Sequence, residues 1–200
     1  MFTRSNVPVS RLRLAGSIVV IVLSAAACFV ISARAQQPAK PVIPDVAVRD
    51  HQGRKLNFYS DLVKDKVVVL NFFYTSCTYT CTMQGRTFSQ LQSLLGERLG
   101  KSVHLISVTT DPAKDNPEQL QAWAKRYNLK SGWTLVTGDE AEINKLLVRL
   151  TGSSAGAGMH VPVTVVVNDR KGTWVGSTEV VGAEQLFKTV DYVTREDDKR

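Results

Sequence analysis

The sequence predicts an α/β fold in which a central, mainly parallel sheet is flanked by helices. Two observations support this class: segments with strand patterns alternate with segments that have helical apolar spacing, and the strands are almost uninterrupted apolar runs. Such strands are buried on both faces, as in parallel sheets that helices cover on each side. A chain of 200 residues has room for one such domain and its appendages.

Each element has its own signal in the sequence. The predicted strands cover 66–73 (KVVVLNFF), 103–108 (VHLISV) and 133–136, followed by a hairpin over 163–167 and 173–177. Apolar residues at helical spacing predict helices around 88–99, 120–127, 143–150 and 183–193. Asn116 followed by Pro117 is an N-cap and first-turn signal, and Gly152 marks a helix end.

The first 35 residues have the pattern of an export signal. Arginines flank an uncharged run over 14–33, and the small-x-small sequence Ala33-Arg34-Ala35 follows it. Three fates are open: cleavage after Ala35, lipidation of Cys28, or retention as an anchor, since twenty residues at ~1.5 Å each span a ~30 Å hydrocarbon core. Each fate places the following domain on the periplasmic side of the inner membrane.

Four segments are expected along the chain. They are a signal peptide or membrane anchor over 1–35, a proline-rich linker over 36–44 (QQPAKPVIP), the α/β domain over 45–193 and a charged tail over 194–200. Within the domain, the low-complexity stretch 152–158 (GSSAGAG) predicts a mobile loop.

Net charge gives no reason to expect a nucleic-acid ligand. The chain has 25 Lys and Arg against 18 Asp and Glu residues, a net charge of +7. Four of the basic residues and none of the acidic ones precede Gln36, so the remainder carries only +3. A charge that small over a whole domain is no electrostatic footprint for DNA or RNA.

Only two cysteines, Cys77 and Cys81, lie in the exported part. A structural disulfide is the simplest interpretation in an oxidising compartment, but a bridge that closes so short a loop stabilises by only about 2 kcal/mol. The pair follows the most apolar strand, at the sheet edge where ligands gather in α/β folds. On a helical turn, residues four apart have Cβ atoms about 5 to 6 Å apart, which suits either a disulfide or one shared metal ion.

The chemistry of the side chains points to copper. A helix N-terminus favours the thiolate, soft thiolates select Cu(I), and one added imidazole also suits Cu(II). His104 falls in a buried strand pattern and is interpreted as a core residue or a support for the ligands, whereas His51 lies in the turn 50–53 and is expected to face solvent. His160 ends the glycine-rich loop beside the last hairpin and is therefore the candidate ligand.

Two methionines, Met83 and Met159, are close in sequence to these candidates. A thioether could assist Cu(I), but packing at the rim of the pocket is the preferred interpretation.

Four stretches together resemble the Sco/SenC family of copper-binding thioredoxin-like proteins: NFFYTSCTYTC at 71–81, SVTTDPAKDNPE at 107–118, GWTLVTG at 132–138 and MHVP at 159–162. The resemblance extends over about 45–193 and implies a thioredoxin-like fold. It implies that Cys77, Cys81 and His160 bind copper, as Cu(I) or Cu(II), and that the two cysteines cycle between dithiol and disulfide. It further implies that Pro162 is a cis proline facing the cysteines.

The function implied by the resemblance is copper delivery to the CuA centre of cytochrome c oxidase, or upkeep of its cysteines. Such a metallochaperone would meet the CuA subunit or another copper-handling protein, and a thiol reductant, close to the membrane. The alternative is a thiol–disulfide oxidoreductase without an obligatory metal, which would not require His160. A third interpretation is a peroxidase of the peroxiredoxin type, since Thr75 precedes Cys77 by two positions and Cys81 could resolve a sulfenic acid.

The chain departs from the family pattern beside the candidate ligands. Many members have proline after a cysteine where this chain has Thr78 and Thr82, and many have Asp where it has Met159. Such positions bear on partner choice and redox poise, because residues around the cysteines set thiolate stability. Asp111 and Asp115 match the family's acidic motif and are interpreted either as turn formers or as a docking surface.

Overall fold

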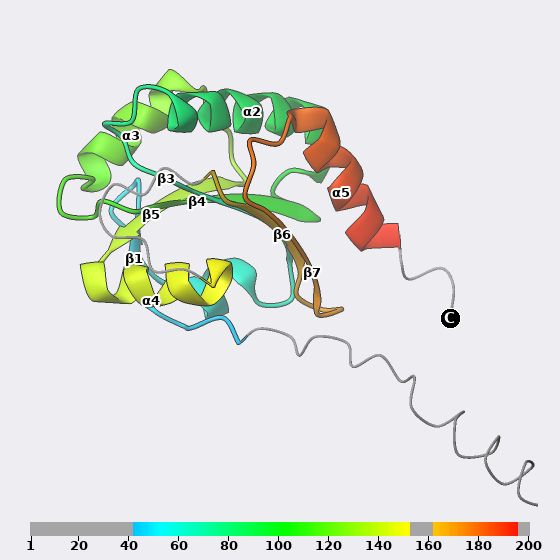
Figure 1. Ribbon diagram of the computed structural model, residues 1–200, viewed down its shortest axis with the longest axis horizontal. Helices are drawn as coiled ribbons and strands as arrows, with labels where there is room; N and C mark the ends of the chain where they lie inside the picture. The colour runs from blue at the N-terminus through cyan, green and yellow to red at the C-terminus, as the bar shows by residue number, and fades with distance from the viewer. Residues whose placement is uncertain (1–41, 153–161, 196–200) are drawn as a thin grey trace, which may run out of the picture. The chain divides into compact units, whose positions relative to one another are not determined.

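The computed structural model describes residues 42–152 and 162–195. All of them belong to the unit Lys40–Arg200, and the other unit, Met1–Ala39, lies outside the described residues. A single sheet separates two layers of helices: α2, α3 and α5 cover one face, and α4 with the short helix η1 covers the other (Figure 1).

The sheet contains seven strands in the order β2-β1-β5-β4-β3-β6-β7. The strands are β1 (Ala47–Asp50), β2 (Lys55–Asn57), β3 (Val67–Phe73), β4 (Val103–Thr109), β5 (Trp133–Gly138), β6 (Thr164–Asn168) and β7 (Thr173–Ser177). The helices are η1 (Phe58–Val63), α2 (Thr80–Leu95), η2 (Gly96–Arg98), α3 (Pro117–Arg126), α4 (Glu140–Thr151) and α5 (Ala183–Arg195).

Parallel pairing is confined to the centre of the sheet. Strand β4 pairs in parallel with β3 and with β5, whereas β1 and β6 pair antiparallel with both of their neighbours. The predicted α/β sheet with flanking helices is confirmed, but the sheet is mixed and mainly parallel only in its three central strands. Short turns join β1 to β2 and β6 to β7, and a hairpin connection requires antiparallel strands, which accounts for these two pairs.

Each face of the sheet has its own hydrophobic core. In β3, Val69 and Phe73 pack toward α2, α3 and α5, while Val68, Leu70 and Phe72 pack toward α4 and η1. Burial on both faces explains why this strand reads as a continuous apolar run.

The predicted helix ends are confirmed at α3 and α4. The Asn116 side chain accepts hydrogen bonds from the backbone N–H groups of Glu118 (2.9 Å) and Gln119 (3.2 Å), and Gly152 ends α4 with a φ of 73°. The helix predicted over 88–99 is shorter than expected, since α2 ends at Leu95, and its apolar face is interrupted by Leu94, which is 44% exposed.

Residues on both sides of the expected domain boundaries take part in the fold. Ile43, placed in the linker by the sequence, is buried in the core beside α4, and the Arg149 side chain donates a hydrogen bond to the Val42 carbonyl (3.1 Å). Helix α5 continues to Arg195, which pairs with Asp191 (3.1 Å). Within 42–152 and 162–195, no helix is long and apolar enough to cross a membrane, and the uncharged run 14–33 lies outside those ranges.

Helices α2 and α3 meet at a glycine. Gly85 is buried on α2, and a Cβ added there would lie 2.6 Å from Cζ of Tyr127, which caps the end of α3. Real Cβ atoms do not approach a ring so closely, so this contact requires the absence of a side chain.

Gly85→Ala is expected to lower the free energy of unfolding by about 1–3 kcal/mol, because the added methyl group forces the Tyr127 ring or a helix to move. Urea unfolding measures the change. Gly176→Ala is the matched control, since the added Cβ would lie an ordinary 3.8 Å from the Trp174 ring nitrogen, and the expected change is within about 0.5 kcal/mol. Equal stability of the two variants would contradict the close-approach argument.

Candidate metal and redox site

Cys77 and Cys81 lie where β3 leaves the sheet and α2 begins. Cys77 is in the connecting loop and Cys81 is in the first turn of the helix, at the carboxyl edge of the parallel strands. Both are free thiols in the structure, and both are buried, with 5% and 6% of their surface exposed. Tyr79 between them is 74% exposed, so the thiols lie directly beneath the surface.

The loop holds the sulfur of Cys77 against the start of α2. The Cys77 N–H donates to the Tyr74 carbonyl (3.2 Å), which closes a turn, and the Cys81 N–H donates to Sγ of Cys77 (3.2 Å). Free N–H groups at a helix N-terminus stabilise negative charge, so this arrangement favours a thiolate at Cys77, as the sequence predicts.

The two thiols differ in acidity. Burial acts to raise the pKa of Cys77, but hydrogen bonds from the Cys81 thiol, the N–H groups of Cys81 and Tyr79 and the Tyr74 hydroxyl outweigh it, and the pKa lies below its ordinary value. Burial, reinforced by the hydrogen bond to Cys77, raises the pKa of Cys81 to about 12. Burial and the nearby sulfurs likewise raise the pKa of the Tyr74 hydroxyl to about 12. Cys77 is therefore the more acidic thiol of the pair, and the Cys81 thiol stabilises its thiolate by a hydrogen bond.

The buried carboxylate of Asp115 holds the cysteine loop in place. Its carboxylate is 1% exposed and accepts hydrogen bonds from the Thr75 N–H (3.0 Å) and from the hydroxyls of Thr75 and Thr109. The cysteine loop is thereby tied to the end of β4. Of the two interpretations of this residue, burial supports the turn former and contradicts the docking surface. Because the Thr75 hydroxyl donates to Asp115, it is not directed at the sulfur as the peroxidase interpretation would need.

Asp111 has a more peripheral position in the same acidic motif. Its side chain is 14% exposed and pairs with the exposed Lys114 (3.0 Å). Its backbone N–H donates to the Thr109 hydroxyl (3.1 Å), so it helps to form the turn that follows β4.

His51 is buried, and the expectation that it faces solvent is wrong. It is 8% exposed, its N–H donates to the Leu135 carbonyl (3.0 Å), and its Nδ1 accepts from the Leu135 N–H (3.4 Å). The cause is the buried carboxylate of Asp50, which accepts from the N–H groups of Gln52 and Arg54 and folds the turn back onto β5. This places His51 at the start of β5, at the sheet edge opposite the cysteines.

His104 lies on β4 as predicted, but it is half-buried rather than part of the core, and it lies at the start of the strand, away from the cysteines, so it does not support the ligands. Burial and the nearby Lys66 lower its pKa. Met83 is 40% exposed on α2, one half-turn beyond Cys81.

The third candidate ligand, His160, lies outside the described residues, as do Met159 and Val161, whose peptide bond to Pro162 would decide the predicted cis proline. In the described ranges, no group of three or more His, Cys, Asp or Glu side chains could hold a metal ion. The structure does describe where the chain returns after His160. Val163 is buried, and its carbonyl accepts from the Gln84 side chain (3.5 Å).

Gln84 is the site residue that the sequence reasoning missed. It lies three positions after Cys81 on α2 and is 4% exposed, so the cysteine helix holds the segment that follows His160. A glutamine among the apolar positions of a buried helix face is the signal that could have indicated it.

The acidity difference predicts which thiol reacts first. When reduced, metal-free protein is treated with limiting iodoacetamide at neutral pH, Cys77 is expected to be alkylated before Cys81, because the pKa of Cys77 is lowered and that of Cys81 is raised. The rate at Cys77 should rise with pH with a midpoint below the ordinary thiol pKa. Fragment-ion mass spectrometry distinguishes the two positions. Equal labelling, or labelling of Cys81 first, would contradict the assignment.

Asp115→Ala is expected to lower the free energy of unfolding by about 1–3 kcal/mol, because the Thr75 N–H loses its acceptor. Alkylation of Cys77 should also become faster as the loop loosens. Asp111→Ala is the control, since its carboxylate pairs with an exposed lysine, and a change within about 0.5 kcal/mol is expected. If both variants matched the parent in unfolding and alkylation, the anchoring role would be disproved.

Two curated relatives show similarity to this chain. A putative copper-binding protein of Stutzerimonas stutzeri is 25% identical over 150 residues, which cover 74% of this chain and 67% of the relative. The SCO1 protein homolog of Bacillus subtilis (strain 168) is 27% identical over 117 residues, which cover 57% of this chain and 58% of the relative. The matches therefore span between about half and two thirds of the relatives' own lengths.

Solved structures show the same fold. BsSco, described as a member of the Sco family of cytochrome c oxidase assembly proteins with a disulfide switch, superposes with a TM-score of 0.64 at 21% identity, over 80% of this chain and 98% of that one. Copper-bound ScoI of Arabidopsis thaliana gives a TM-score of 0.60 at 16% identity, over 77% and 99%. The predicted thioredoxin-like Sco fold is thereby confirmed.

The family assignment rests on the sequence as well as on the fold. The sequence model of the SCO1/SenC family matches residues 34–153, which is more than half of the chain and includes both cysteines. The chain belongs to the SCO1/SenC family.

Proposed function

We propose that this protein is a copper-binding, redox-active assembly factor that delivers copper to the CuA centre of a respiratory oxidase or maintains its cysteines. The observation that carries the proposal is the pair of buried thiols at the start of α2, one of which has a lowered pKa. Support also comes from the relatives, since one is named a putative copper-binding protein and another structure holds copper.

Copper, the cargo of such a protein, would be held by the thiolates of Cys77 and Cys81 and a ring nitrogen of His160. The thiolates suit Cu(I), and the imidazole extends the site to Cu(II). His160 precedes Val163 by three residues, and three extended residues span at most about 10 Å. Gln84 of the cysteine helix donates a hydrogen bond to the Val163 carbonyl. The three-residue span is therefore short enough for His160 to reach that helix.

The same cysteine pair favours a second function, thiol–disulfide exchange without an obligatory metal. The Cys77 thiolate would attack a disulfide of the partner and release one partner thiolate, which takes up a proton. The Cys81 thiol would then lose its proton and attack the mixed disulfide, which releases the second partner thiol and leaves a Cys77–Cys81 disulfide. The lowered pKa of Cys77 beside a protonated Cys81 suits this order of events.

Export to the periplasmic side of the inner membrane is part of the proposal. It is supported by the basic flank, the uncharged run 14–33 and the Ala33-Arg34-Ala35 pattern. The proposed partners are the CuA subunit or another copper-handling protein, together with a thiol reductant.

Copper titration of the reduced protein tests the three-ligand site. One copper ion per chain is expected. Replacing either cysteine by serine should weaken binding of both Cu(I) and Cu(II) by more than about 100-fold, which exceeds the loss typical when a residue that only hydrogen-bonds to a metal ligand is removed. His160→Ala should weaken Cu(II) more than Cu(I), because imidazole is the harder ligand. Oxidation of the pair to a disulfide should release the metal.

The variants His51→Asn and His104→Asn serve as controls, because neither histidine lies at the cysteine edge. Both variants should bind copper as the parent protein does. If His160→Ala left the affinity and absorption spectrum of Cu(II) unchanged while the cysteine variants lost them, the three-ligand site would be wrong. The metal-independent thiol–disulfide function would then be the better account.

A further inference from the structure

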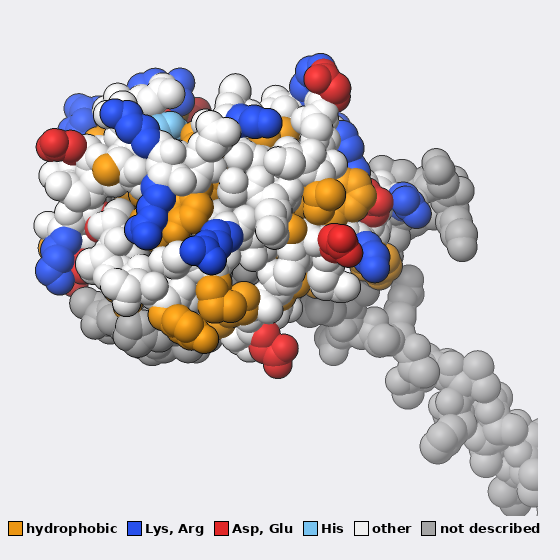
Figure 2. Space-filling view, turned by 90° about the horizontal axis from the view of Figure 1, so that it is seen from above, with side chains coloured by type: hydrophobic (Ala, Val, Ile, Leu, Met, Phe, Trp, Pro, Cys, Tyr) orange, Lys and Arg blue, Asp and Glu red, His pale blue; other side chains and the backbone are white. Residues whose placement is uncertain are grey.

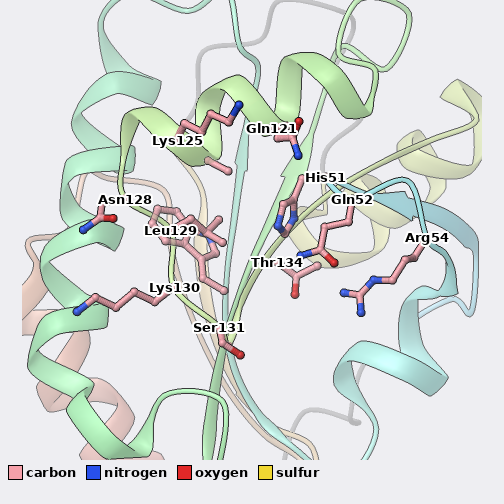
Figure 3. Close-up of a pocket in the computed structure, with 13 residues that line it drawn as sticks. His51, Gln52, Arg54, Gln121, Lys125, Asn128, Leu129, Lys130, Ser131 and Thr134 are labelled. Atoms are coloured by element: carbon pink, nitrogen blue, oxygen red, sulfur yellow. The ribbon is translucent and has the colours of Figure 1, made fainter.

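A polar cavity opens at the sheet edge opposite the cysteines (Figure 3). It has a volume of about 630 Å³, within the range of small-molecule sites. The turn after β1, helix α3 and the loop before β5 form it, and we call it the His51 pocket. Parallel strands β3, β4 and β5 run away from this edge toward the cysteines, so the two sites lie at opposite ends of the strands.

The lining of the His51 pocket is positively charged. It includes Arg54, Lys125 and Lys130 and no Asp or Glu residue. Lys125 and Lys130 form no ion pair among the described residues, and both are exposed, at the rim of the cavity. The nearest counter-charge in the turn is Asp50, which is fully buried and already binds Nε of Arg54 (2.7 Å). On the face shown in Figure 2, Lys and Arg side chains are spread over both halves, with scattered Asp and Glu side chains among them.

His51 adds a hydrogen-bond donor to these charges. Its ring lies amid the lining side chains in Figure 3, and its Nδ1 accepts the Leu135 N–H. A ring proton therefore lies on Nε2, and burial lowers the pKa of His51. No hydrogen bond of the described residues uses Nε2, and this atom is accessible to a ligand. Gln52, Gln121, Ser131 and Thr134 add further amides and hydroxyls to the lining.

We propose that the His51 pocket binds a phosphate-class oxyanion, either free or as the headgroup of an anionic lipid. Lys125 and Lys130, which have no lining carboxylate beside them, favour a negatively charged ligand, and the neutral donors of the lining match several oxygen acceptors. The volume exceeds that of one inorganic ion, so an organic phosphate fits as well as phosphate itself. The site is independent of the cysteines and of the proposed copper function.

The test uses the reduced, metal-free full chain in dodecyl maltoside micelles, with the histidine rings followed by NMR. The chain has three histidines, so the signals can be assigned by substitution. Inorganic phosphate is titrated in one arm and dihexanoyl phosphatidylglycerol in the other, each against sodium chloride at equal ionic strength. The His51 signal is expected to shift saturably, whereas His104, which points to the other face of the sheet, should not respond.

Charge-matched variants decide whether the pocket is responsible. Lys125→Gln with Lys130→Gln should weaken binding at least about tenfold. The control, Lys101→Gln with Lys114→Gln, removes the same charge from exposed lysines outside the pocket and should bind as the parent does. Saturation by phosphate identifies a free anion, and saturation by the lipid alone identifies a headgroup. A His51 signal that responds to neither, or equal affinity in the two double variants, would overturn the proposal.

Discussion

Burial of β3 on both faces is the constraint on which the rest of the structure depends. With one core on each side, this strand cannot shift by one residue without moving its apolar side chains to the wrong layer. Its end is therefore fixed, and the loop that carries Cys77 must leave the sheet at one place. Asp115 then holds that loop through Thr75, so the fixed strand end becomes a fixed position for the sulfur.

The same packing explains why two chemically identical side chains behave differently. Cys77 receives N–H groups from the start of α2, whereas Cys81 is already within the helix and directs its own proton to Cys77. A helix terminus thus makes one thiol acidic and leaves the other as its donor. This arrangement suits the proposed attack by one sulfur in the metal-free state, and the proposed joint coordination of a soft cation that would replace the shared proton.

The parallel centre of the sheet gives the molecule two edges with opposite character. The carboxyl edge carries the buried thiols, and the amino edge carries the basic His51 pocket. The full length of the strands separates a ligand at one edge from the site at the other edge. The two proposed functions can therefore be tested separately, although both sites depend on the register of β3, β4 and β5.

Elements whose signals are local could be predicted from the amino-acid sequence. The buried run of β3, the cap at Asn116, and the CxxxC pair at a helix start belong to this group, because periodicity and capping act within a few residues. The antiparallel edges of the sheet, the burial of His51 and Asp115, and the link from Gln84 to Val163 became visible only in the folded structure. These depend on partners far apart in the chain, and a polar residue reads as solvent-exposed until the group that satisfies its hydrogen bonds is known.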